Sequence, residues 1–158
     1  MRFQTIVEEI MSSHHSLLRR ELPKITEQLH ELVTRYPDNE NLAEAQQIYT
    51  KVRSKVETHL RDEETVLFPI GIAIESGTAP MPTEMNLHER LAEMEKEHDG
   101  CGKALAGVQL TISSTVPPSD AREKLLATIQ LVQEDFVEHV EKENSKVHPL
   151  FIQLLEHS

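Results

Sequence analysis

Four long stretches of this chain carry apolar residues at alternating spacings of four and three, and segments rich in proline, glycine and polar residues separate them. The third stretch reads Leu87, Leu91, Met94, His98, Cys101, Leu105, Val108 and Ile112. This spacing forms one apolar stripe along an α-helix, which must be buried against other helices. We predict helices over roughly 4–35, 40–75, 84–114 and 119–156 from these stripes and the turn signals between them.

The predicted fold is an all-α, antiparallel, up-down four-helix bundle, because four striped helices joined by short connections pack most simply in that way. A chain of 158 residues is long enough for a core of this kind. We therefore expect a single domain over residues 1–158. Prolines disturb helices, so Pro23 is expected to kink the first helix, and Pro69 and Pro149 to kink or end the second and fourth.

Six polar residues interrupt the apolar stripes at positions that should face the core. Two of the helices carry an HxxxE pair, and the other two carry a single histidine each. The six residues are His15, His59 with Glu63, His98, and His139 with Glu143. An i, i+4 pair lies on one face of a helix. Counted from the connecting segments, all six lie at the same depth within about a helical turn. Burying such groups is costly unless something binds them, so a metal site is predicted.

Imidazole nitrogens and carboxylates together suit a pair of iron, manganese or zinc ions. Four histidines and two glutamates do not fill the coordination positions of two octahedral ions. A site of this composition therefore has room for bridging glutamates, for a bridging oxide or hydroxide, and for a small ligand such as O2 or NO. We expect a reactive centre rather than a purely structural one.

Neighbouring residues receive different interpretations. His14 lies about 100° round the helix from the first candidate ligand, so we expect it at the surface or supporting a ligand. His148 points away from the ligands of its helix and is interpreted as a non-ligand. Glu64 and Glu97 are expected on solvated faces, although Glu97 also suits the role of orienting a ligand imidazole. Cys101 is interpreted as a small core residue rather than a redox-active thiol.

Bulk composition narrows the class of protein. The net charge of −11 argues against nucleic acid or an anionic membrane as a partner. One cysteine allows no intrachain disulfide and fits a reducing compartment. The N-terminus lacks a signal-like apolar core, and the stretch VLFPIGIAI is too short to cross a bilayer. We therefore predict a cytoplasmic protein, whose oligomeric state the sequence leaves open.

Four sequence blocks resemble the hemerythrin-like fold, and more narrowly the repair-of-iron-centres family of di-iron proteins. They are His15 ahead of LRRELP, HLRDEETVLFP, MEKEHDGCG and HVEKENSKVHPLF. Oxygen-carrying hemerythrins use HxxxH on the third helix and HxxxxD on the fourth. Gly102 and Asn144 stand at those places here, whereas HxxxE on the second and fourth helices matches the repair family.

The resemblance implies two iron ions, bridged by oxo or hydroxo and by carboxylates, on His15, His59, Glu63, His98, His139 and Glu143. It also implies a role in restoring iron–sulfur proteins damaged by nitric oxide or oxidants, through NO binding or iron delivery. The alternative is a hemerythrin-like module that senses or stores O2 or iron without catalysis, so enzymatic activity stays an open question. The best-known members add an N-terminal domain with paired cysteines. This chain contains no counterpart, so we expect a shorter relative that senses or handles NO.

Overall fold

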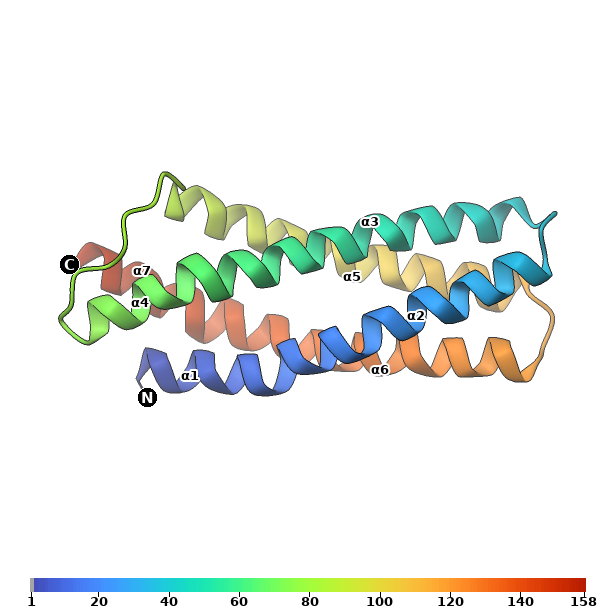
Figure 1. The fold of residues 1–158 in the computed structure, drawn as a ribbon, viewed down its shortest axis with the longest axis horizontal. Helices are drawn as coiled ribbons and strands as arrows, with labels where there is room; N and C mark the ends of the chain where they lie inside the picture. The colour runs from blue at the N-terminus through green and yellow to red at the C-terminus, as the bar shows by residue number, and fades with distance from the viewer. Residues whose placement is uncertain (1) are drawn as a thin grey trace.

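A computed structural model describes residues 2–158 as four helical rods that lie side by side and alternate in direction (Figure 1). The first rod comprises α1 (Phe3–Ile10), η1 (Met11–His15) and α2 (Ser16–Arg35); the second α3 (Glu40–Asp62), η2 (Glu63–Leu67) and α4 (Phe68–Glu75); the third α5 (Leu87–Thr115); and the fourth α6 (Asp120–Lys142), η3 (Glu143–Val147) and α7 (His148–Glu156). Residues 2–158 contain no strand, so the all-α four-helix prediction is confirmed.

Side-chain caps start three of the rods where the chain leaves a connecting segment. The carboxamides of Asn39 and Asn86 and the hydroxyl of Ser119 each accept a hydrogen bond from the backbone N–H three residues later. Such caps satisfy donors that the first turn leaves free. The cap at Asn86 also explains why the third rod begins at Leu87 rather than near residue 84 as predicted.

The segments η1, η2 and η3 are π-helical turns inside otherwise α-helical rods. The backbone N–H groups of Phe68 and His148 donate to the carbonyls of Glu63 and Glu143, five residues back. Pro69 and Pro149 follow directly and sit in the first turns of α4 and α7. A proline clashes with the carbonyl four residues before it in α geometry, and the wider π turn carries the rod past that point. Of the two alternatives predicted for these prolines, a kink or an end of the helix, the second is wrong, because both rods continue through α4 and α7.

The rods enclose two separate apolar cores, one on each side of the layer that contains the three π turns. The larger core includes Leu29, Tyr49, Ile112 and Val132 together with their buried neighbours in α2, α3, α5 and α6. The smaller core contains Phe3, Ile6, Val7, Ile10, Leu67, Phe68, Ile70, Leu91, Met94, Val147 and Phe151. Polar residues can be buried between the two cores only if they bind one another or a ligand.

No helix among residues 2–158 combines the length and apolar character needed to span a bilayer.

Candidate metal centre

All six residues predicted from the sequence meet between the two cores. His15 ends η1, Glu63 begins η2 and Glu143 begins η3, while His59, His98 and His139 come from α3, α5 and α6. Each is at most 6% exposed. Every rod contributes at least one of them, and three lie at the edge of a π turn, a feature that is frequent at functional sites.

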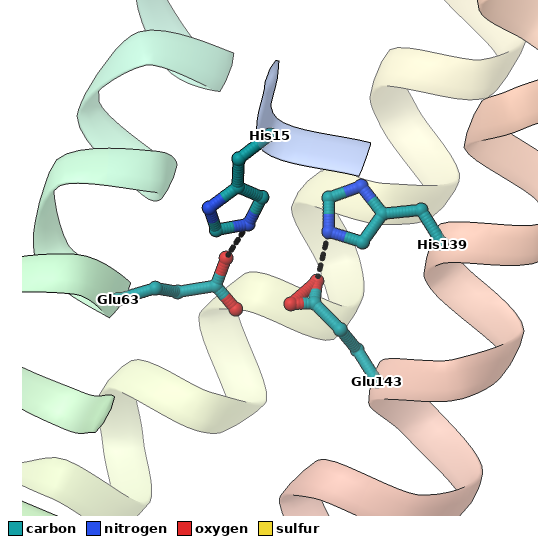
Figure 2. A group of neighbouring side chains, drawn as sticks. All are labelled: His15, Glu63, His139 and Glu143. Carbon is teal, nitrogen blue, oxygen red and sulfur yellow. Dashed lines mark ion pairs between the residues drawn. The ribbon is translucent and has the colours of Figure 1, made fainter. Parts of the chain in front are cut away.

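Four of the six side chains form a first donor group. Figure 2 shows His15, Glu63, His139 and Glu143 converging from three rods. His15 Nε2 lies 3.2 Å from Glu63 Oε1, and His139 Nε2 lies 3.1 Å from Glu143 Oε1. One ligand atom from each residue lies within 4.8 Å of the ligand atoms of the other three.

A second donor group consists of His59, His98 and Glu143. His98 Nε2 lies 3.1 Å from Glu143 Oε1 and 3.3 Å from His59 Nε2. Glu143 therefore belongs to both groups. Glu63 also faces both, because its Oε1 lies 3.2 Å from His15 Nε2 and 3.6 Å from His59 Nε2.

The donor atoms fit a bound cation better than they fit one another. His15 Nε2, His139 Nε2, both oxygens of Glu63 and Oε2 of Glu143 are buried without a hydrogen-bond partner in residues 2–158. The distances near 3 Å between them lack the alignment of a hydrogen bond. With bonds of about 2.1 Å, neighbouring ligands of one octahedral ion lie about 3.0 Å apart. The arrangement is thus that of ligands directed at shared metal positions.

Oxygen atoms from other rods orient three of the four imidazoles through Nδ1. His15 Nδ1–H donates to Glu64 at 2.7 Å, and His59 Nδ1–H donates to Glu97 at 3.1 Å. His98 Nδ1–H donates to Asn144 Oδ1 at 3.2 Å. In each case Nε2 is left for a metal. Glu97 therefore orients a ligand imidazole, as the sequence suggested. The assignment of Glu64 to a solvated face was wrong, because Glu64 accepts hydrogen bonds from both His15 and Arg19.

Two further histidines are buried beside the donors. His14 is 3% exposed and His148 is 2% exposed, so His14 is not a surface residue. The His14 ring stacks on His139, and the His148 ring stacks on His98. Neither belongs to a donor group. His14 lies inside a π turn and His148 directly follows one, so the extra residue of each turn changes the face that α-helical counting assigns to them.

Burial and neighbouring charges shift the pKa values of four of these groups, His15, His59, Glu63 and Glu143. Burial and the charge of Glu143 raise the pKa of Glu63 well above its usual range. Burial also tends to raise the pKa of Glu143, but His139 and the neighbouring donors outweigh burial and lower this pKa well below that range. Burial lowers the pKa of His15 to about 4. Burial also disfavours the charged form of His59, but the nearby carboxylates of Glu143, Glu63 and Glu97 outweigh burial and raise its pKa to about 12. Bound cations would replace protons in such a cluster.

A small cavity of about 10 Å³ adjoins the second donor group. His59, His98, Cys101 and Phe136 contribute to its wall. A space of this size accommodates about one water-sized molecule. Cys101 is 5% exposed, and burial raises the pKa of its thiol. Its burial within the larger core agrees with its interpretation as a small core residue.

Comparison with known proteins adds evidence independent of this geometry. The model of the Hemerythrin HHE cation binding domain matches residues 6–151. The chain belongs to the hemerythrin HHE family. The matched residues include all six donors, so the His and Glu cluster lies within the cation-binding domain that the family name describes.

Among known proteins, the chain is similar to the iron-sulfur cluster repair protein YtfE of Citrobacter koseri, of Escherichia coli O1:K1 and of Escherichia fergusonii. Identity is 26% over 148 residues in each case, covering 91% of this chain and 64% of the relative. The chain thus spans about two thirds of the length of these relatives. The resemblance to the repair-of-iron-centres family is confirmed.

Proposed function

We propose that the chain binds two iron ions through His15, His59, Glu63, His98, His139 and Glu143, with Glu63 and Glu143 bridging them. The observation that best supports this proposal is the overlap of the two donor groups. Both glutamates face imidazoles of both groups, and the first group alone holds five buried donor atoms that lack a hydrogen-bond partner. Two overlapping groups favour two ions over one.

The donor set and the relatives together favour iron. Imidazole and carboxylate also accept manganese and zinc, whereas the YtfE relatives are named for the repair of iron–sulfur clusters. A pair of irons, when bound, supplies exchangeable coordination positions and one-electron redox chemistry. The protein contributes the buried donors, the oxygens on Nδ1 of three imidazoles, and two apolar cores that limit the access of water.

We propose that the protein acts in the cytoplasm in defence against nitrosative or oxidative stress, by binding NO or by delivering iron to damaged iron–sulfur proteins. The small cavity beside His59 and His98 supports access of a small ligand to the second donor group, since it has room for about one water-sized molecule. The similarity to YtfE supports the link with cluster repair. The net charge of −11 suits interaction with a cation rather than with nucleic acid.

Electron paramagnetic resonance of the anaerobically reduced, iron-loaded protein with NO tests this function. We expect an iron–nitrosyl signal and about two irons per chain. Glu143→Ala should lose the signal while retaining its helix content by circular dichroism. The matched control is His88→Ala, which removes an exposed imidazole from α5. A reversible oxygen complex without any nitrosyl signal would instead favour oxygen binding or sensing.

A further inference from the structure

The second and fourth rods carry the same block of residues around the metal centre. Residues 59–69 and 139–149 both place His, Glu and Pro at the first, fifth and eleventh positions. The structure extends this correspondence to the contacts that each block makes. Glu64 accepts from His15 where Asn144 accepts from His98. The centre thus consists of two related halves.

Aromatic contacts follow the same relation. The Phe68 ring stacks on His15, with centroids 6.0 Å apart and an interplanar angle of 11°. In the other half, the His148 ring stacks on His98 with centroids 6.0 Å apart and an angle of 16°. Corresponding positions therefore make corresponding contacts even where the residue type differs.

One pair of corresponding positions makes different contacts. Glu97 precedes His98 in sequence and accepts the Nδ1–H of His59 at 3.1 Å. By the same relation, the residue preceding His15 should serve His139, and that residue is His14. It offers no oxygen. Within residues 2–158, His139 Nδ1 is buried and has no hydrogen-bond partner, unlike Nδ1 of the other three candidate imidazoles.

His14 contacts His139 by stacking instead. The ring centroids are 5.2 Å apart and the planes differ by 3°. Two side chains from α6 hold the His14 ring in place: Asp135 Oδ1 at 2.7 Å from Nδ1 and Lys142 Nζ at 3.0 Å from Nε2. An ammonium can only donate, so Nε2 accepts from Lys142 and Nδ1–H donates to Asp135. Both ring nitrogens of His14 are thereby occupied.

We propose that His14 is a positioning residue for His139, which it orients by stacking and leaves without an oxygen acceptor on Nδ1. An oxygen acceptor on the second nitrogen makes a ligand imidazole a stronger donor. His139 is therefore the weakest donor of the four, and the ion that it binds exchanges more readily than it would with a carboxylate at residue 14. The inference rests on the proposed metal centre and makes His14 a regulator of iron release.

The test places an oxygen acceptor next to Nδ1 of His139. His14→Glu reproduces the relation between Glu97 and His59, and His14→Gln supplies an uncharged oxygen in case the carboxylate prevents folding. Outer partners of metal ligands change affinity by about 10–100-fold, so we expect zinc to bind the weaker site at least about tenfold more tightly in these variants. Transfer of ferrous iron to a chelator should slow by a similar factor. If the substitution increases the affinity for ferric iron tenfold more than the affinity for ferrous iron, the reduction potential of the bound iron falls by about 59 mV.

The matched control is Ser13→Glu, which adds the same carboxylate one residue earlier on an exposed position of η1. Zinc affinity is measured by competition with a colorimetric chelator, so the result does not depend on iron or NO chemistry. The proposal is overturned if folded His14→Glu and His14→Gln match the parent within twofold in zinc affinity and potential, or if Ser13→Glu produces the same change. Failure of the nitrosyl test alone would leave the zinc result interpretable.

Discussion

The sharing of Glu143 by both donor groups predicts unequal effects of two single substitutions. His98→Ala removes one of the three donors in the second group and leaves all four donors of the first group intact. Glu143→Ala removes a donor from each group, leaving three and two. We expect His98→Ala to retain about one tightly bound ion per chain. Glu143→Ala also loses one of the two proposed bridging carboxylates, so we expect it to retain none.

The expected effect on stability follows from linkage between binding and folding. At a free metal concentration of 100 times Kd, each ion stabilises the native state by about 2.7 kcal/mol. For a protein of this size, 1 kcal/mol shifts Tm by about 2–4 °C. Each ion should therefore raise Tm by about 5–11 °C. The parent should show two such increments, His98→Ala one and Glu143→Ala none.

The assay compares each variant with its own metal-free form, which removes any effect of the substitution on the bundle itself. Metal per chain is measured by elemental mass spectrometry after gel filtration, and Tm by scanning calorimetry with and without zinc. His88→Ala should behave as the parent. The reasoning is refuted if His98→Ala loses both ions, or if Glu143→Ala keeps as much metal as His98→Ala.

Three further outcomes can be measured in the metal-free protein. Gly71→Ala should destabilise the fold by about 1–3 kcal/mol in urea titration, because its Cβ would overlap the buried ring of Phe3; an unchanged midpoint would contradict this packing. Asn39→Ala removes the cap of α3 and should cost about 1 kcal/mol, whereas Asn39→Asp should largely retain it. Burial disfavours ionised Glu64, but hydrogen bonds, that from Arg19 foremost, outweigh burial and lower its pKa. Its ionised form therefore stabilises the fold above the ordinary pKa of 4.5, so the Tm deficit of Glu64→Gln should shrink as pH falls through and below that value.

The apolar stripes were sufficient to predict the helices and the layer in which the six candidate residues meet. Stripe phase separates core from surface over a long helix, so His15 and His139 could be assigned to the interior. Distances between ligand atoms, and the division into two groups that share Glu143, could not be predicted from the sequence because they depend on how the four rods pack.

The π turns were missed because one extra residue barely alters a spacing of four and three. The π turns nevertheless change which residues face the interior, since burial of His14 and His148 depends on the altered helix phase. A signal was present in the sequence: Pro69 and Pro149 each follow a candidate glutamate by six residues. Glu64 was misplaced because its partner His15 is distant in sequence.

The separation of the two apolar cores has a consequence for folding cooperativity. The larger core and the smaller core, which contains Phe3 and Phe151, share no buried side chain, and the layer of buried polar residues lies between them. Without a cation, that layer contributes little attraction between them, and the smaller core can open as a separate unit. Ions bound by all four rods would join the two units, so hydrogen exchange should report two opening free energies in the metal-free protein and one in the loaded protein.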